Sequence, residues 1–206
     1  MGGSRVARLM GIEKIAVLGA GQMGNGIAQV AACAGYSVVM IDIKQEYLEA
    51  GLAAIEKSLA RLVAKERMTQ TDADEALALV SVSTEKSAAA DADLVVEAIP
   101  EIPELKFSIF AELDAICKPE AILASNTSSI SINEIAAATN RPDKVIGMHF
   151  MNPVPIMRLV EIINGSETSK AVTDAVVEAS ERMGKTALAC NDSPGFVSNR
   201  DRKSVV

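Results

Sequence analysis

The chain has 206 residues, 49% of them apolar, which suits one domain or one domain plus a fragment. Its formal net charge of −7 argues against nucleic acid or an anionic membrane as a partner, and no apolar run approaches the roughly 18 residues that span a bilayer. The three cysteines are scattered without metal-ligand spacing, so we expect no metal site and a reducing, cytoplasmic location.

The first ordered segment is predicted to be a strand, a glycine turn and a helix. Residues 1–11 lack the apolar core of a secretory signal and are predicted to be a loose leader. An apolar run at 15–18 then leads into Gly19-Ala20-Gly21-Gln22-Met23-Gly24. Gly19 permits a tight turn, Gly21 lets the backbone approach a pyrophosphate, and Gly24 lets the helix pack close to the strand. We assign these glycines, with Gln22 and Met23, to a dinucleotide site. The alternative is a glycine-rich turn in some other doubly wound protein.

Asp42 ends the second apolar run, 38–41, at the place where a carboxylate can accept both hydroxyls of an adenosine ribose. A 2′-phosphate would meet the same negative charge, which favours NAD over NADP. The neighbouring Lys44 weakens this inference.

The remaining pattern alternates strands with helices. Strands are predicted at 80–83, 94–99, 121–124, 144–151, 157–163 and 186–190, and helices at 45–67, 72–79, 104–116, 131–138 and 168–183. This alternation predicts an α/β protein with a Rossmann-type doubly wound, mostly parallel sheet. A long helical hairpin follows the second strand.

Three sets of polar residues outside the glycine turn are candidates for function. Lys57, Arg61 and Lys65 step by four along the first hairpin helix, which indicates either a solvated face balanced by acidic neighbours or an anion contact. Glu101 follows the strand at 94–99, at the edge where open α/β sheets bind ligands. A polar run at 125–129 follows the next strand and is either helix-capping chemistry or a substrate site.

His149 is the only histidine, and it lies on a predicted strand before an Asn-Pro-Val-Pro turn. Glu161 lies on the strand after that turn. If the two strands fold back on each other, the carboxylate reaches the imidazole, fixes its tautomer and stabilises its charged form. Loss of hydride from an alcohol to a nicotinamide requires a base of this kind. The alternative is a surface histidine with an unrelated glutamate.

Six motifs occur in an order and spacing that closely resemble one family, the NAD-binding domain of the 3-hydroxyacyl-CoA dehydrogenases, including the 3-hydroxybutyryl-CoA dehydrogenases. They are G-A-G-Q-M-G-N-G-I-A, D-L-V-V-E-A-I-P-E, A-S-N-T-S-S, H-F-M-N-P-V-P, L-V-E and S-P-G-F-V-S-N-R, and they extend to Arg200. The resemblance implies reversible oxidation of an (S)-3-hydroxyacyl-CoA to the 3-oxoacyl-CoA with NAD, in fatty acid β-oxidation or butanoate metabolism.

The resemblance also implies roles for single residues. His149 matches the catalytic base, with Glu161 as its partner, and Ser128 matches a serine that bonds the reacting oxygen close to the nicotinamide. Asn199 matches an asparagine that completes the polar site. The residues matched to the cofactor cleft are Glu101, Lys106 and Asn152, and those matched to the CoA moiety are Ser58 and Lys65.

The chain departs from the family after Arg200. The family continues into a helical domain that dimerises and closes over the substrate, whereas residues 201–206 lack the apolar pattern of further helical turns. A common sequencing-adapter sequence encodes the same six residues, so our hypothesis is a longer natural gene. We therefore expect an NAD-binding domain at 12–192, the start of a missing helical domain at 193, and an aberrant tail from 201. We expect weak cofactor binding and little turnover from this chain alone, and a homodimer from the full-length protein.

Two other functions remain open at the level of the sequence. One is a nucleotide-binding module without turnover. The other is a different β-hydroxyacid dehydrogenase, although such enzymes commonly use a lysine where this chain has the His149–Glu161 pair.

Overall fold

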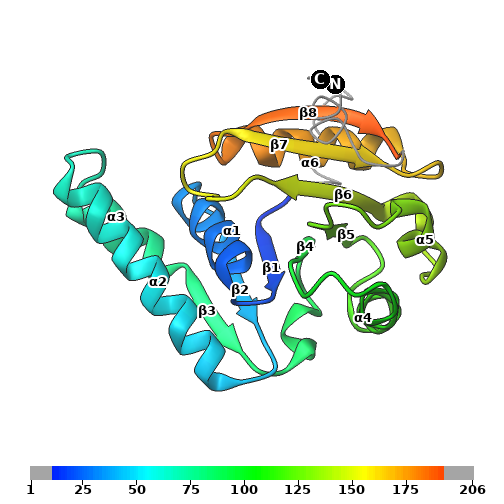
Figure 1. Cartoon of the computed structure of the whole chain (residues 1–206), viewed down its shortest axis with the longest axis horizontal. Coiled ribbons are helices and arrows are strands. Elements are labelled where there is room, and N and C mark those ends of the chain that lie inside the picture. The colour runs from blue at the N-terminus through cyan, green and yellow to red at the C-terminus, as the bar shows by residue number, and fades with distance from the viewer. Residues whose placement is uncertain (1–10, 193–206) are drawn as a thin grey trace, which may run out of the picture.

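A single mixed sheet of eight strands organises residues 11–192, which are the residues that the computed structural model describes (Figure 1). The strand order is β3-β2-β1-β4-β5-β6-β7-β8. The strands are β1 (Lys14–Leu18), β2 (Ser37–Ile41), β3 (Val80–Ser83), β4 (Leu94–Glu97), β5 (Ile122–Ser125), β6 (Val145–Phe150), β7 (Leu159–Asn164) and β8 (Thr186–Asn191). The first six run parallel, β7 is antiparallel to β6, and β8 is parallel to β7. This confirms the predicted Rossmann-type, mostly parallel sheet.

Helices cover both faces of the sheet. The helices are α1 (Gln22–Cys33), α2 (Gln45–Ala64), α3 (Gln70–Ala78), α4 (Pro103–Ile116), α5 (Ile132–Ala137) and α6 (Lys170–Arg182), with 3₁₀ turns η1 (Lys86–Ala89) and η2 (Pro142–Lys144). Side chains of α1, α2, α3 and α6 enter one apolar cluster, and those of η1, α4 and α5 enter the other. The central strands β1, β4 and β5 are therefore covered on both sides, which explains their nearly continuous apolar sequence.

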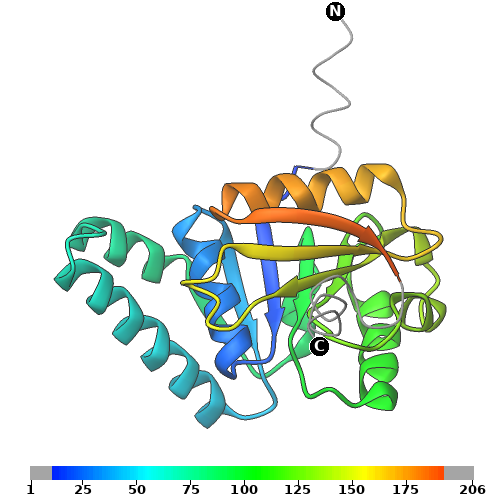
Figure 2. The same cartoon turned by 45° about the horizontal axis from the view of Figure 1, so that its top comes forward.

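The long helical hairpin projects from the sheet in both views (Figures 1 and 2). Its first helix, α2, ends at Ala64, three residues before the predicted end at Arg67. The difference arises at Glu66, whose φ of 55° lies in the left-handed region and cannot continue a helix. Thr69 then begins α3 by accepting the backbone N–H of Asp72 on its side chain.

The parallel arrangement brings several carboxyl ends together at one edge of the sheet. Leu18 of β1 pairs with Glu97 of β4, and Glu97 pairs with Ser125 of β5. The segments that follow these strands hold the glycine turn, Glu101 and the polar run at 125–129. Within residues 11–192 no helix is long and apolar enough to cross a membrane. The helix start predicted at 193, the tail and Asn199 lie outside the described residues.

A buried guanidinium, that of Arg141, closes the C-terminal end of α4. Its Nη1 donates to the carbonyls of Lys118 and Ala121 at 2.7 and 3.2 Å, and its Nη2 donates to those of Asp114 and Cys117 at 2.9 and 3.1 Å. Its Nε donates to the Asp114 carboxylate at 2.6 Å. Burial raises the pKa of the Asp114 carboxyl. Hydrogen bonds from the backbone N–H of Asn140 and from the Arg141 guanidinium lower it by more, so this pKa lies below its usual range.

Arg141→Met is expected to lower the free energy of unfolding by about 3–5 kcal/mol at neutral pH, because four carbonyls and a carboxylate lose their donor. Arg141→Lys should recover only part, since an ammonium lacks the fork geometry. A carboxyl with a depressed folded pKa stabilises above its unfolded value, about 3.9, and loses that stability as pH falls. The difference between parent and Arg141→Met in urea unfolding should therefore shrink at acid pH. An equal difference at all pH values would contradict this assignment.

Candidate active site

The glycine turn between β1 and α1 forms a cradle that larger residues would fill. Gly19 has a φ of 102°, and a Cβ there would lie 2.5 Å from the carbonyl oxygen of Ala98. A Cβ on Gly24 would lie 1.8 Å from the carbonyl oxygen of Gly19. By contrast, a Cβ on Gly21 would meet no atom within 4 Å, so open space adjoins the turn at that point. No side chain caps the start of α1, which leaves its first N–H groups facing that space.

Asp42 stands beside this turn at the end of β2. Its Oδ2 accepts the N–H of Ala20 at 2.7 Å, and its Oδ1 accepts the N–H of Ile43 at 2.7 Å. The carboxylate is thereby oriented, and each oxygen retains a lone pair for a further donor. An uncapped helix start, room for a pyrophosphate and an oriented acid together fit a dinucleotide.

The antiparallel register of β6 and β7 places His149 directly opposite Glu161. Imidazole Nδ1 and carboxylate Oε2 lie 3.3 Å apart. The Glu161 side chain is 0% exposed and that of His149 is 13% exposed. A buried carboxylate behind a partly accessible imidazole is the arrangement that orients a general base.

A cleft of about 350 Å³ adjoins His149 and is lined by six of the predicted site residues. The residues that line it are Met23, Ala98, Ile99, Glu101, Lys106, Asn126, Ser128, His149, Phe150, Met151 and Asn152. Gln22 of the glycine turn is joined to this cleft by a hydrogen bond, in which its Nε2 donates to Oδ1 of the lining residue Asn152 at 3.1 Å. The structure thus brings the turn, Ser128, Glu101, Lys106 and His149 to one place.

The predicted CoA contacts lie elsewhere. Ser58 and Lys65 are on and just after α2 and take no part in lining this cleft. Lys57, Arg61 and Lys65 are all exposed, so the stripe faces solvent.

Glu97, which no sequence motif assigns to the site, is fully buried under the cleft. Its carboxylate accepts hydrogen bonds from Lys106 Nζ at 2.7 Å and from Ser125 Oγ at 2.8 Å. The sequence could have pointed to Glu97, because it is the only charged residue in a strand whose apolar pattern predicts burial on both faces.

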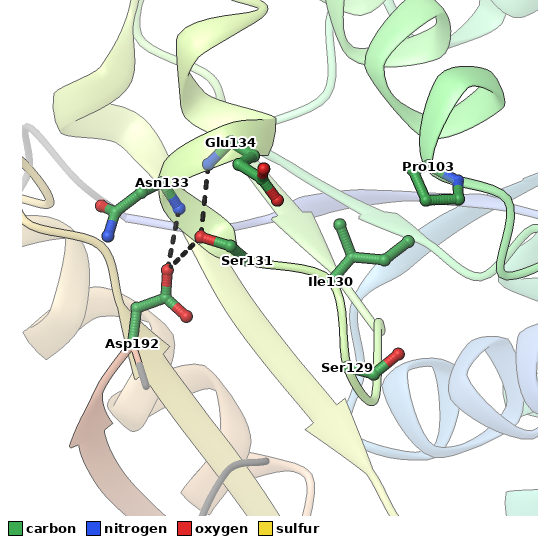
Figure 3. A pocket seen from close by; sticks show the side chains of 7 residues that line it. All are labelled: Pro103, Ser129, Ile130, Ser131, Asn133, Glu134 and Asp192. Atoms are coloured by element: carbon green, nitrogen blue, oxygen red, sulfur yellow. Dashed lines mark hydrogen bonds between the residues drawn. The ribbon is translucent and has the colours of Figure 1, made fainter. Parts of the chain in front are cut away.

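A second hollow, of about 490 Å³, lies beside α5 (Figure 3). Asp192 accepts the Ser131 hydroxyl at 2.6 Å and the Asn133 N–H at 3.0 Å, which fixes the end of β8 to the start of α5. The other residues that line this hollow are Pro103, Ser129, Ile130 and Glu134. These side chains offer carboxylates and hydroxyls but no base comparable to His149. Within residues 11–192, no three acidic, histidine or cysteine side chains gather as a metal site.

The turn, the oriented Asp42 and the adjoining cleft define a dinucleotide-binding Rossmann domain. The sequence model of the family described as "3-hydroxyacyl-CoA dehydrogenase, NAD binding domain" matches residues 14–193. The chain belongs to this family, and its cofactor is NAD.

Named relatives agree with the family. A probable 3-hydroxybutyryl-CoA dehydrogenase of Bacillus subtilis is 53% identical over 191 residues, covering 93% of this chain and 67% of the relative. Its counterpart in Deinococcus radiodurans is 55% identical over 188 residues, covering 91% and 67%. The solved structure of (S)-3-hydroxybutyryl-CoA dehydrogenase from Ralstonia eutropha superposes with a TM-score of 0.91 at 46% identity, covering 92% of this chain and 67% of that one. The chain spans about two thirds of the length of each.

Proposed function

We propose that this chain carries the NAD-binding and proton-transfer half of an enzyme that reversibly oxidises an (S)-3-hydroxyacyl-CoA to the 3-oxoacyl-CoA. The observation that carries the proposal is the His149–Glu161 pair, 3.3 Å apart, in the cleft that adjoins the glycine turn. The names of the relatives support the substrate class.

The chemistry divides between the cofactor and the side chains. When bound, NAD supplies the acceptor for the hydride that leaves C3 of the substrate. Nε2 of His149 takes the hydroxyl proton, while Glu161 holds Nδ1–H and balances the charge that forms on the ring. The Ser128 hydroxyl, which lines the same cleft, donates to the reacting oxygen.

The CoA moiety is proposed to lie along α2. Ser58 and Lys65 are matched to this role by family resemblance, and exposed Lys57 and Arg61 add positive charge on the same helix. Ammonium and guanidinium groups bind phosphate oxygens through charge-assisted hydrogen bonds. Asn199 is proposed, on resemblance alone, to complete the polar site near His149.

We further propose that residues 12–192 form the NAD-binding unit, that the protein is cytoplasmic and that the full-length protein is a homodimer. Family resemblance supports the first and last statements. Light scattering of the purified full-length protein at micromolar concentration tests the last, and a monomer that is fully active would contradict it.

Turnover of acetoacetyl-CoA with NADH tests the proposed reaction. With the full-length protein we expect NADH oxidation with the CoA thioester and little with free acetoacetate at the same concentration. Comparable rates with the free acid would indicate another hydroxyacid dehydrogenase. NADH binding seen by fluorescence, without any turnover, would restrict the chain to a nucleotide-binding module.

Asp42→Ala is expected to weaken NAD binding by ~10-fold, because the ribose loses a charged acceptor. Discrimination against NADP should relax at the same time, since the repulsion of a 2′-phosphate disappears. Asp42→Asn keeps an acceptor for the Ala20 N–H but not for the Ile43 N–H, so urea unfolding of both variants is the control for the local fold. Calorimetric titrations with both cofactors measure the effect. A parent protein that binds NADP more tightly than NAD would show this reading of Asp42 to be wrong.

A further inference from the structure

Five residues at the floor and wall of the cleft form a closed circuit of hydrogen bonds and one ion pair, which we call the Glu97 ring: Ser125, Glu97, Lys106, Glu101 and Thr127. Glu97 accepts the Ser125 hydroxyl at 2.8 Å and the Lys106 ammonium at 2.7 Å. The same ammonium lies 3.4 Å from Oε2 of Glu101, whose Oε1 accepts the Thr127 hydroxyl. The Thr127 N–H donates to Ser125 Oγ at 3.2 Å and closes the circuit.

The Glu97 ring holds two carboxylates and one ammonium, so it carries a net charge of about −1. Glu97 and Lys106 are 0% and 1% exposed, and Glu97 also accepts the Ile99 N–H at 2.9 Å. Three donors, one of them an ammonium, therefore meet one buried side chain. Burial raises the pKa of Glu101, but the hydrogen bond from Thr127 and the charge of Lys106 outweigh it, so its pKa lies below the usual range.

The surplus charge faces the cleft of His149. Glu101 and Lys106 both line that cleft, and Lys106 is the only permanently cationic side chain among its described lining residues. Because Lys106 pairs with Glu97 at 2.7 Å and with Glu101 at 3.4 Å, one carboxylate remains without a compensating cation. Buried Glu161 adds a second negative charge behind the imidazole. Charges in such a site are screened less than those on a surface.

The two forms of the cofactor differ in charge at the ring that reacts. The oxidised nicotinamide is cationic and the reduced nicotinamide is neutral, and nearby protein charge is one way in which a site tunes such a couple. A net negative cleft therefore stabilises the oxidised form more than the reduced form.

We propose that Glu97, a residue that touches neither cofactor nor substrate, supplies the surplus negative charge that makes this cleft favour oxidised over reduced cofactor. The inference rests on the proposed function only in placing the nicotinamide beside His149. Glu97 acts through Lys106: its carboxylate neutralises that ammonium and so leaves the charge of Glu101 uncompensated in the cleft.

Glu97→Gln tests the proposal, because the amide keeps the size of the side chain and removes its charge. Dissociation constants for NAD and NADH are measured by calorimetry at one ionic strength, without substrate. We expect NAD binding to weaken by ~10-fold relative to NADH binding. If Glu97 only held the loop of Ser128 in place, both forms would weaken together and their ratio would stay constant, which would overturn the proposal.

A matched control and a second variant complete the experiment. Asp174→Asn changes the total charge by the same amount, but Asp174 forms an exposed ion pair with Lys170 on α6. The ratio of the NAD and NADH dissociation constants should therefore not change. If Glu97→Gln fails to fold, Glu101→Gln removes the other carboxylate, on a side chain that is 38% exposed. NAD binding should then weaken relative to NADH binding in the same way. An unchanged ratio in that variant overturns the proposal. Binding of neither cofactor to the parent chain would overturn the proposed function with it, whereas lack of acyl-CoA turnover alone would leave the ratio test valid.

Discussion

Gly21→Ala is expected to abolish most cofactor binding while the protein stays folded, whereas Gly24→Ala is expected to damage the fold itself. A Cβ on Gly21 meets no protein atom within 4 Å, and its φ of −66° suits any residue. The added methyl occupies the space beside the uncapped start of α1, where a pyrophosphate would lie. NAD affinity should fall by ~10–100-fold, with the free energy of unfolding unchanged or raised by about 0.5 kcal/mol.

Gly24 sits three residues further on but has no such room. A Cβ there would lie 1.8 Å from the backbone oxygen of Gly19, and neither backbone can move without opening the turn. Gly24→Ala should therefore cost about 3 kcal/mol or more in urea unfolding, as severe overpacking does. The pair separates cofactor contact from turn geometry: equal losses of stability in both variants, or normal NAD binding by Gly21→Ala, would contradict the cradle.

His149→Ala should lower kcat by ~10²–10⁴-fold while the dissociation constant for NADH changes by less than about twofold. The reason is that we propose the imidazole as the acceptor of the hydroxyl proton, and the glycine turn with Asp42 as the main cofactor contacts. Steady-state kinetics with acetoacetyl-CoA and NADH, together with fluorescence titration of NADH, measure the two quantities. An unchanged kcat would remove His149 from its proposed role.

Glu161→Gln provides the matching test of the second residue of the pair. The imidazole remains, but its buried partner loses the charge that fixes the tautomer, so kcat should fall by ~10²-fold or more. Glu167→Gln, an exposed acid beyond the end of β7, is the control and should leave kcat unchanged. Equal kcat values for the parent, Glu161→Gln and Glu167→Gln would show that the contact between Glu161 and His149 has no role in catalysis.

Local patterns were sufficient to predict the sheet and the turn. The strand at 80–83 matches β3, and the glycine spacing places the turn at the end of β1 because Gly19 and Gly24 have no room for a Cβ. The fold-back of β6 and β7 was also foreseeable, since a proline-rich turn separates two apolar runs. Local patterns therefore predict strands and turns well, because these features depend on residues that are neighbours in the sequence.

Long-range polar contacts could not be predicted in this way. Lys185 is buried and donates to the carbonyls of Val154 and Met157, 31 and 28 residues away, which holds the loop that carries Asn152. Arg141 likewise meets carbonyls 20 or more residues distant. Nothing adjacent to either residue signals such partners, because they arise only when separate elements pack. Four members of the buried polar circuit lie at positions that the sequence marks as candidates, but only the packed structure links them to Glu97, the lone charge in an apolar strand.

The single histidine of the chain makes the central claim directly observable. Nitrogen and proton resonances of the imidazole, recorded on protein labelled at histidine and free of any affinity tag, report on His149 alone. The account predicts a Nδ1–H tautomer held by Glu161, and a large shift of the Nε2 resonance when acetoacetyl-CoA is added in the presence of NAD. Nε2 and Nδ1 resonances that are both indifferent to cofactor and thioester would contradict it.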